Sequence, residues 1–583
     1  MQQASLPQPL EHGTGRRLTD RRQRVADVVV DLLQSEGIDT VFGIPGGTIA
    51  PIFDALLDRP QIEMVVTKHE MGAVFAAAAY ARTSGKLGVV LVTSGPGILN
   101  TLTGVATALL DSAPILVLAG EVSRQSYGRG ALQEGSPYSL NVVAVSQPLA
   151  KRAFEIHEAQ QAPYLLAQAI AIAKSGRPGP VVVTLPMDVS HTVTQVPLTS
   201  QEAEVRFHIE PRALDAAAKA MVRSRERAIF VGSGCRAGRG PTLVRQLAER
   251  LGCPVMTTPK AKGVFPESHP LSLGVFGMGG HPSATAHLER GIETLLALGS
   301  SLSDLSTNGW SKALNPQRSL IHVDVDAARL GRVYPAAISV TSTVEAFLDA
   351  LHAKLDADPA LAAELSAPRP ARAYGVGTHA DPTLASTRAE RIAPQRAVWE
   401  LQRLMPADTI YAIDSGEHYF FATHYLKIDD PLGFLVMTGL GAMGSSFGGA
   451  IGAQRAQPER RVVVICGDGG FAMAGTEVAT AAQHGLPIIF AVMNDQRLGM
   501  VELGSTALYG RTPPYSTGPI DVAGLGRALG AESHVIDGDG QLERLDLGTR
   551  RGPIVLDIRI DEAVKMPKNG RFEALGAQSR GTR

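Results

Sequence analysis

Residues 462–500 read VVVICGDGGFAMAGTEVATAAQHGLPIIFAVMNDQRLGM, and this stretch decides the fold. A β-branched apolar run at 462–465 ends in a glycine turn, and a segment of helical composition follows at 472–484. A glycine and a proline end that helix before a second apolar run at 488–493. Strand, helix and strand in this order make a βαβ unit, so the stretch predicts a parallel sheet.

The polar residues of this stretch follow its two strands. Asp468 comes after the first strand and Asn494 after the second. Neighbouring parallel strands would bring both side chains to the sheet edge where ligands bind. A carboxylate and an amide oxygen suit Mg²⁺, and the glycines beside Asp468 let backbone N–H groups approach a phosphate. The stretch therefore predicts a metal–diphosphate site, although GDGG is also the composition of a plain sharp turn.

Length and composition indicate an ordinary globular protein of several domains. The chain has 583 residues, of which 44% are hydrophobic and 19% charged, with a net charge of −1. This charge gives no general attraction to nucleic acid or to a membrane surface. No apolar run reaches the ~20 residues of a membrane span. The 3 cysteines are too few for a disulfide framework, so we expect a reducing, cytoplasmic setting.

Repeated strand–turn–helix units divide the chain into three doubly wound α/β domains with parallel sheets. The sequence RGPIVLDI near the end of the third domain echoes PGPVVVTL in the first, which indicates that these two domains are structural repeats. The N-terminal residues are polar and basic, without the core of a secretory signal. The predicted division is a disordered basic tail at 1–24, domains at 25–190, 205–352 and 389–570, a linker at 353–388 and a C-terminal tail at 571–583.

Five motifs carry a resemblance to a known family. They are VFGIPGG, KHEMGA, TSGPG and LDSAPILVLAGEV in the first domain, and the spacing from Gly467-Asp468-Gly469 to Asn494 in the third. Together they resemble the thiamine diphosphate (ThDP) enzymes of the acetolactate synthase branch. The resemblance implies a pyrimidine-binding domain, a central Rossmann-like domain and a diphosphate-binding domain. It also implies ThDP and Mg²⁺ as cofactors, with Asp468, Asn494 and a backbone carbonyl near Gln496 as metal ligands.

By the same resemblance, two residues stand at the reacting centre. Glu70 matches the glutamate that contacts the aminopyrimidine ring and promotes the tautomer that takes a proton from the thiazolium carbon. Gln133 would face the reacting carbon, and Lys151 matches a further family position. The plainer interpretations stay open: a first-turn acid favoured by the helix dipole for Glu70, a loop amide for Gln133 and a surface lysine for Lys151.

Further residues match cofactor contacts of the family. Met443, in the sequence TGLGAMG, matches the bulky apolar side chain that bends the cofactor, with plain core packing as the alternative. The full set of cofactor-binding residues implied by the resemblance is Pro45, Gly46, Glu417, His418, Gly441, Met443, Gly467, Gly469, Gly470 and Met500.

The chain departs from the family around the predicted pocket. Leu132 stands where phenylalanine is usual, and Glu502-Leu503-Gly504 replaces a segment with a Gln-Trp pair. Glu417 stands where glutamine is usual, and an acid beside a diphosphate would have to point away and leave the contact to His418. The pocket is altered on two sides, so a role in amino-acid biosynthesis does not follow from the resemblance.

Two cations near the end of the chain could hold a substrate carboxylate. They are Arg511 and Lys565, and solvated surface charges are the alternative for both.

The central domain of this branch holds FAD, which does no net redox work. The residues at matching positions are Thr258, Phe276, Gly277, Gly299 and Asp324. The stretch Pro259-Lys260-Ala261-Lys262 differs from the usual apolar flavin contact. FAD, an ADP-like nucleotide and an empty site therefore all stay open.

The leading hypothesis from the resemblance is a carboligase that decarboxylates a 2-oxo acid such as pyruvate and transfers the acyl-carbanion equivalent to an acceptor carbonyl. A ThDP-dependent decarboxylase or lyase of specialised metabolism is the alternative within the family, and a non-catalytic binding subunit is the alternative outside it. A nicotinamide dehydrogenase would need a GxGxxG turn, and Gly43-Ile44-Pro45-Gly46-Gly47 lacks that spacing. The family places its active sites between subunits, so we expect a homodimer or homotetramer.

Overall fold

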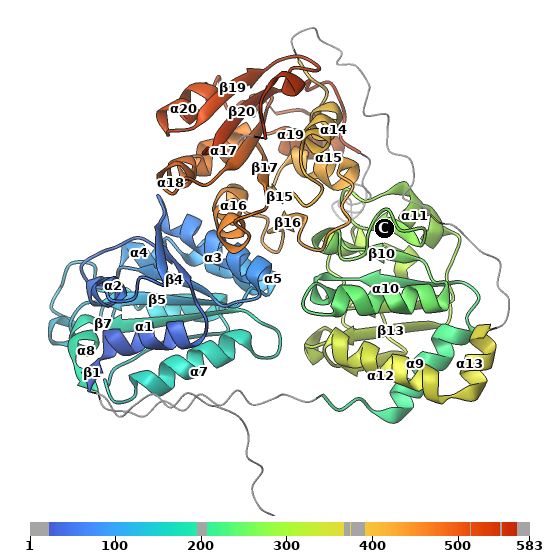
Figure 1. The fold of residues 1–583 in the computed structure, drawn as a ribbon, viewed down its shortest axis with the longest axis horizontal. Coiled ribbons are helices and arrows are strands. Elements are labelled where there is room, and N and C mark those ends of the chain that lie inside the picture. Colours follow the sequence, from blue (N-terminus) through green and yellow to red (C-terminus); the bar gives the residue numbers. More distant parts are fainter. Residues whose placement is uncertain are drawn as a thin grey trace, which may run out of the picture.

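The computed structural model describes residues 22–194, 207–366, 374, 391–513, 515–548 and 551–567. These residues form three domains, each built on a six-stranded sheet flanked by helices (Figure 1). All strand pairs inside the three sheets are parallel, so the predicted fold class is confirmed. In these ranges, no helix combines the length and the apolar character that crossing a membrane requires.

The N-terminal domain has the strand order β3-β2-β4-β5-β7-β6. Its strands are β2 (Thr40–Gly43), β3 (Glu63–Val66), β4 (Gly88–Val92), β5 (Ile115–Glu121), β6 (Arg152–Glu155) and β7 (Pro180–Pro186). Its helices are α1 (Val25–Ser35), α2 (Ala50–Leu57), α3 (Glu70–Ser84), α4 (Pro96–Leu99), α5 (Leu102–Asp111), α6 (Val142–Ser146), α7 (Ala162–Lys174) and α8 (Met187–His191). The central strands are continuous apolar runs because helices cover both of their faces.

A short antiparallel pair joins the two ends of this domain. β1 (Gln23–Arg24) pairs with β8 (Val193–Thr194). The predicted disordered tail is therefore wrong for Gln23 and Arg24, because Arg24 also pairs with Asp27 at the start of α1. Apart from Arg22, which is exposed and irregular, the rest of that prediction lies outside the described residues.

The C-terminal domain repeats the topology of the N-terminal one. Its order β16-β15-β17-β18-β20-β19 connects the strands in the same sequence of neighbours. Its strands are β15 (Ile410–Ile413), β16 (Phe434–Val436), β17 (Val462–Gly467), β18 (Ile488–Asn494), β19 (Glu532–Ile536) and β20 (Ile554–Arg559). Its helices are α14 (Pro394–Leu404), α15 (Glu417–Tyr425), α16 (Ser445–Ala456), α17 (Asp468–Ala474), α18 (Glu477–Gln483), α19 (Gly499–Tyr509) and α20 (Val522–Ala528). The predicted repeat is therefore present.

The central domain has a different order, β11-β10-β9-β12-β13-β14, which is the order of dinucleotide-binding sheets. Its strands are β9 (Arg227–Val231), β10 (Val255–Thr257), β11 (Ser272–Val275), β12 (Thr294–Leu298), β13 (Ser319–Asp324) and β14 (Ile338–Thr341). Its helices are α9 (Pro211–Arg223), α10 (Gly240–Leu251), α11 (Pro282–Glu289), α12 (Val344–Ala357) and α13 (Pro359–Ser366).

The predicted linker at 353–388 begins too early. Its first residues complete α12, and the next ones form α13, whose Leu361 is buried in the core of the central domain. The alanine-rich composition that suggested a linker also suits a helix, because alanine has the highest helix propensity. Apart from Tyr374, the rest of this prediction lies outside the described residues, as do the predicted tail at 571–583 and most of the gap at 191–204.

The helix predicted at 472–484 is two short helices. α17 begins directly after β17 and ends at Ala474, and α18 begins at Glu477. Gly475 and Thr476 separate them, because glycine is a poor helix former. The break places the side chain of Glu477 at the start of α18, next to the N-terminal domain.

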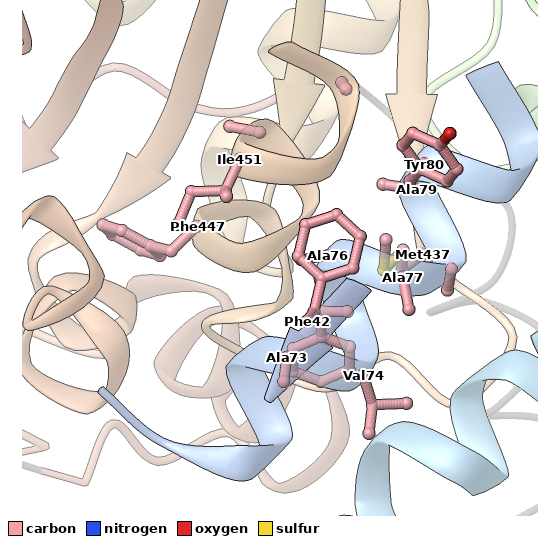
Figure 2. Packing of buried hydrophobic residues seen from close by; sticks show 14 of the residues in the cluster. Phe42, Ala73, Val74, Ala76, Ala77, Ala79, Tyr80, Met437, Phe447 and Ile451 are labelled. Carbon is pink, nitrogen blue, oxygen red and sulfur yellow. The ribbon is translucent and has the colours of Figure 1, made fainter. Parts of the chain in front are cut away.

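The N- and C-terminal domains share one hydrophobic core along α3 and α16. Figure 2 shows residues of both domains in this cluster, among them Ala76 of α3 and Ile451 of α16. α3 is rich in alanine and α16 in glycine, so the two backbones approach closely. A Cβ atom added to Gly452 would stand only 1.9 Å from the carbonyl oxygen of Ala76.

Gly452→Ala should therefore destabilise the chain by about 1 to 3 kcal/mol, the usual cost of overpacking a close contact. The clash is with a backbone atom, which cannot move aside without separating α3 from α16. Thermal unfolding of the purified protein measures the loss. The matched control is Gly449→Ala in the same helix, because its nearest neighbour is the flexible methyl group of Met437 at 3.3 Å. Equal losses for the two variants would contradict the prediction.

Candidate active site

A cavity lies at the carboxyl edge of the C-terminal sheet, where the strand order reverses between β15 and β17. Open α/β sheets bind their ligands at this place. The cavity has a volume of about 660 Å³ and is lined by the loops after β15, β16, β17 and β18, with one wall from the central domain. The predicted site residues that line it are Glu417, His418, Gly441, Met443, Gly467, Asp468, Gly469, Gly470 and Met500.

Two buried side chains after β17 and β18 are arranged as metal donors. Asp468 and Asn494 are each 2% exposed, and the parallel pairing of their strands makes them neighbours. Thr517 donates a hydrogen bond to one carboxylate oxygen of Asp468 at 2.5 Å. The amide nitrogen of Asn494 donates to Asp557 at 2.8 Å, whereas its oxygen is buried without a partner among the described residues. Asp557 thus fixes the amide so that its oxygen is left for a ligand.

The third predicted metal donor is the backbone carbonyl of Gln496, a residue in the left-handed conformation. Gln496 has a φ of 60°, which side chains rarely adopt. Its carbonyl oxygen accepts hydrogen bonds from the N–H of Thr517 at 3.0 Å and from the hydroxyl of Ser516 at 3.2 Å. Thr517 therefore contacts two of the three predicted metal donors, Asp468 and Gln496.

The donor set fits Mg²⁺. One carboxylate, one amide oxygen and a backbone carbonyl are hard oxygen ligands, and Mg²⁺ commonly takes only one or two carboxylates and completes its shell with phosphate and water. The buried, unpartnered oxygen of Asn494 beside the carboxylate of Asp468 is the observation that meets this requirement. Groups of three or more His, Cys, Asp or Glu side chains placed to hold a metal ion are absent from the described part of the chain.

The glycine turn after β17 packs closely against neighbouring residues. A Cβ atom on Gly469 would stand 3.0 Å from Leu498 and 3.2 Å from the terminal methyl of Met443, and one on Gly470 would stand 2.3 Å from a carboxylate oxygen of Asp414. Asp414 is 1% exposed and accepts a hydrogen bond from the N–H of Gly444 at 2.8 Å. Burial raises the pKa of Asp414 to about 6. The turn thus has its glycines where side chains would not fit.

His418 adds a neutral polar group to the same wall. Burial lowers the pKa of His418 to about 4, so its imidazole is uncharged at neutral pH. Its Nε2 atom is buried without a hydrogen-bond partner in the described ranges. Together with the glycine turn, this free ring nitrogen suits the oxygens of a diphosphate.

Glu417 lies on the cavity wall, opposite the start of α19. A Cβ atom on Gly499 would stand 2.5 Å from one carboxylate oxygen of Glu417 and 3.2 Å from one of Asp495. Burial, aided by the charge of Asp495, raises the pKa of Glu417 to about 7, although Arg497 and Lys565 oppose this. Glu417 is thus turned toward Gly499 and Asp495.

The pKa of Glu417 makes stability depend on pH. The pKa of Glu417 in the folded protein lies above the ordinary value of a glutamate. Its contribution to the free energy of unfolding is therefore complete below about pH 4 and is lost as the pH rises through about 7. In Glu417→Gln the free energy of unfolding should fall by about 1 to 3 kcal/mol less over this pH range than it does in the wild type. Melting temperatures of the protein without ThDP and Mg²⁺, from pH 5 to pH 8, measure it. The control is Glu63→Gln at an exposed site. An unchanged pH slope in Glu417→Gln would refute the assignment.

Met443 extends over the glycine turn. Its side chain is half-buried and lines the cavity, between Gly441 and Gly444, which both have a positive φ. The loop is tied to the N-terminal domain, because the N–H of Gly439 donates to Asp111 at 2.9 Å. The side chain therefore faces the cavity, as the predicted wedge requires.

Glu70 and Gln133 lie together at the carboxyl edge of the N-terminal sheet. Glu70 is the first residue of α3, is half-buried, and accepts a hydrogen bond from the amide of Asn100 at 3.0 Å. Gln133 is exposed, has a φ of 63°, and lies against Gly95, on which a Cβ atom would stand 3.0 Å from its Cα atom. Gly95 and Asn100 flank α4, so one short helix connects the two predicted catalytic residues.

The predicted site residues thus fall into two groups, one in each repeat. Pro45 and Gly46 follow β2 at the strand-order reversal of the N-terminal sheet, on the same edge as Glu70. Within the described chain, none of Pro45, Gly46, Glu70 and Gln133 lines the 660 Å³ cavity that contains Asp468. A single chain does not bring the two groups together.

Other predicted residues do not line the cavity either: Asn494 and Gln496 lie at and just after the end of β18, next to residues that do, and Lys151, Arg511 and Lys565 lie elsewhere. Lys151 lies just before β6, and its amine donates to the carbonyls of Ile172 and Ser175, the latter at 2.7 Å, so it has a structural role at the end of α7. Arg511 and Lys565 are exposed and do not line the cavity. Leu132 is 87% exposed beside Gln133.

A second cavity of about 860 Å³ lies at the carboxyl edge of the central sheet, at its reversal between β9 and β12. Of the five residues predicted there, Thr258, Gly299 and Asp324 line it. Phe276 instead packs edge-on against Phe230 in the core, and Gly277 lies outside the lining. The second cavity adjoins the first, because Arg177 and Lys260 line both.

The second cavity is cationic. Four arginines line it: Arg82, Arg177, Arg236 and Arg329. Arg82 and Arg236 both donate to the backbone carbonyl of Lys260, whose amine pairs with Asp111 at 2.5 Å. This lining fits an anionic dinucleotide such as FAD.

Sequence reasoning missed the supporting residues Thr517, Asp557, Asp414 and Glu477. Asp557 had a detectable signal, because it is an acid within the otherwise apolar run IVLDI. Thr517 had none, since it lies in a loop far along the chain.

Comparisons with known proteins agree with this geometry. The chain matches the models of the thiamine pyrophosphate (that is, ThDP) enzymes: the N-terminal TPP binding domain over residues 23–140, the central domain over 214–351 and the C-terminal TPP binding domain over 414–558. It is 33% identical to a probable acetolactate synthase large subunit of Methanocaldococcus jannaschii, over 93% of each chain. It is 31% identical to the acetolactate synthase isozyme 1 large subunit of Escherichia coli K12, over 95% of this chain and 97% of that protein. It is 32% identical to the acetolactate synthase large subunit of Corynebacterium glutamicum, over 85% and 78%. The chain therefore belongs to the ThDP-dependent enzymes, as a member of their acetolactate synthase-like family.

Proposed function

We propose that this chain is a carboligase that decarboxylates a 2-oxo acid such as pyruvate and joins the remaining acyl unit to an acceptor carbonyl. The observation that carries the proposal is the site in which Asp468, His418 and the glycine turn line the cavity, with the unpartnered oxygen of Asn494 next to Asp468 at the end of the paired strand. When bound, ThDP supplies a nucleophilic carbon that stabilises negative charge after loss of CO₂.

The chain's own residues divide this work. Asp468 and Asn494 hold Mg²⁺, with the carbonyl of Gln496 as a third donor, and His418 with Gly467, Gly469 and Gly470 holds the diphosphate. Glu70 exchanges a proton with the aminopyrimidine, as its half-buried carboxyl group permits. Gln133 would face the reacting carbon, and Met443 would support the cofactor in a bent form.

The active site is completed by a second copy of the chain, so the smallest active unit is a homodimer. Support comes from the separation of the two groups of site residues, because Glu70 does not line the cavity of its own chain. A homotetramer would be a pair of such dimers. The substrate is a small 2-oxo acid, and the three buried cysteines, which form no disulfide, suit a reducing compartment such as the cytoplasm.

FAD would occupy the cationic cavity of the central domain, where the arginines would hold its diphosphate. The pair of Lys260 with Asp111 lies where the two cavities adjoin, so it is the residue pair that a flavin ring would meet. The protein purified from cells should be yellow and release flavin on denaturation. A colourless protein with released ADP or no nucleotide would refute FAD and leave the ThDP proposal unaffected.

The decisive experiment follows products by NMR after mixing the chain with ThDP, Mg²⁺ and pyruvate. Acetolactate is the expected product. Acetaldehyde would instead make the protein a decarboxylase, the alternative to which the sequence departures at Leu132 and Glu502 point. Unchanged pyruvate with bound ThDP would exclude pyruvate as donor, and larger 2-oxo acids would be tested next. Failure to bind ThDP would make the chain a non-catalytic subunit.

A further inference from the structure

A carboxylate of the C-terminal domain lies against the start of the helix that carries Glu70. Glu477, the first residue of α18, is 2% exposed. One of its oxygens accepts hydrogen bonds from the backbone N–H groups of Lys68 and His69, both at 3.1 Å. The other accepts from the hydroxyl of Thr480 at 2.7 Å and from Lys68 at 3.3 Å. Lys68 and His69 directly precede Glu70 in the chain.

The sequence around Glu70 is shaped to admit this carboxylate. A Cβ atom on Gly72 would stand 2.4 Å from one oxygen of Glu477, so only glycine fits there. The N–H groups of Lys68 and His69 lie beyond the end of β3 and ahead of the intrahelical bonds of α3. A negative charge at a helix N-terminus is also favoured by the helix dipole.

Two separate contacts therefore fix Glu70. Its side chain is held from within the N-terminal domain by Asn100. The backbone directly before it, at Lys68 and His69, is held by Glu477 from the C-terminal domain, across the close contact of α3 with α16. Glu477 does not itself line the described cavity around Asp468.

We propose that Glu477 is a positioning residue for Glu70: it sets the backbone from which the Glu70 carboxyl group reaches the aminopyrimidine of ThDP. The inference rests on the proposed function, because it assigns Glu477 to the proton transfer that Glu70 performs. Such a transfer depends on geometry, and a displacement of about 1 Å can cost about 10²-fold in rate.

The two informative variants differ in how many of these contacts they keep. Glu477→Gln keeps one oxygen for Lys68 and His69 but places an NH₂ group toward the hydroxyl of Thr480. Glu477→Ala removes every acceptor and leaves two backbone N–H groups unpaired. We expect the rate of proton exchange at the reactive carbon of bound ThDP to fall about 10²-fold in Glu477→Ala and about 3- to 10-fold in Glu477→Gln.

Quenched-exchange NMR in D₂O, with ThDP and Mg²⁺ at saturation, measures this rate without any turnover of substrate. Calorimetric titration gives the affinity for ThDP in parallel. A purely structural role would lower the melting temperature but leave the exchange rate at saturation unchanged. Partial recovery in Glu477→Gln relative to Glu477→Ala is expected if hydrogen bonding to Lys68 and His69 is the cause.

The matched control is Glu400→Gln. Glu400 is a fully buried glutamate of the same domain that accepts from the backbone N–H of Gly540 at 3.1 Å, away from α3. Glu400→Gln should lower the melting temperature but leave the rate of proton exchange at bound ThDP unchanged. Wild-type exchange rates in both Glu477 variants, or in Glu477→Gln if Glu477→Ala does not fold, would overturn the proposal. If the wild type does not accelerate exchange over free ThDP, the proposed function itself fails.

Discussion

Replacing Glu70 by glutamine is expected to lower turnover by about 10²- to 10⁴-fold, the range for removal of a general acid–base group. Glutamine preserves the size of the side chain and can still meet the amide of Asn100, which approaches Glu70 at 3.0 Å. It cannot accept and return a proton. Because other residues would hold Mg²⁺ and the diphosphate, the affinity for ThDP should change much less than turnover does. Steady-state kinetics and calorimetric titration of ThDP separate the two effects.

Glu63→Gln is the control for this variant. Glu63 is an exposed glutamate at the start of β3, at the opposite end of the strand from Glu70, and it pairs with Arg455. The turnover of the Glu63→Gln variant should equal that of the wild type. Wild-type turnover in Glu70→Gln would contradict the role given to Glu70. Loss of ThDP binding in Glu70→Gln, with activity restored at high ThDP, would instead make Glu70 a binding residue only.

Much of the fold could be predicted from sequence because its signals are local. Short β-branched runs that end in glycine turns locate strands such as β17 and β18, and their parallel pairing places Asp468 beside Asn494 as predicted. The repeat was visible as two similar closing strands, β7 and β20. The signals that mislead are also local: an alanine-rich composition suits a linker as well as the helix α13 that it forms, and a run of helical composition continues across Gly475, where the helix breaks.

The supporting contacts could not be predicted because they join segments far apart in the chain. Thr517 reaches Asp468 from a loop, and Asp557 reaches Asn494 from β20. The contact of Glu477 with Lys68 and His69 crosses from one domain to another. No local pattern encodes such pairs, since each depends on the assembled sheet or on the contact of α3 with α16.

The departure at Glu417 changes the charge of the site. The diphosphate, Asp468, Asp495 and Glu417 would all be negative above neutral pH, and Arg497 alone pairs directly with Asp495 among the described residues, at 2.9 Å. Burial raises the pKa values of Asp495, to about 6, and of Glu417, to about 7, which lowers this repulsion in the weakly acidic range. We therefore expect that a metal cation is needed to hold a diphosphate beside these carboxylates, and this dependence can be measured.

Asp468→Asn should lower the affinity for ThDP in the presence of Mg²⁺ by at least about 10²-fold, because loss of even an outer partner of a metal site typically costs about 10- to 100-fold. Asp468 supplies the only carboxylate of the predicted donor set, and an amide is a weaker ligand for Mg²⁺. With a chelator in place of Mg²⁺, Asp468→Asn should bind ThDP more tightly than the wild type does. The wild type then presents a buried carboxylate to the diphosphate, whereas the variant presents a neutral group. Calorimetric titration of ThDP with and without Mg²⁺ gives all four affinities.

Two further variants make this test specific. Thr517→Val removes the hydroxyl that donates to Asp468 and leaves the carboxylate in place, so it should lower the affinity by about tenfold and keep the dependence on Mg²⁺. Asp408→Asn changes an exposed acid ahead of β15 and should have no effect. The role of Asp468 is contradicted if Asp468→Asn keeps the wild-type gain in ThDP affinity on addition of Mg²⁺. A loss that is equal with and without Mg²⁺ would show that Asp468 holds the glycine turn in shape, because a metal ligand must lose the contribution of the metal itself.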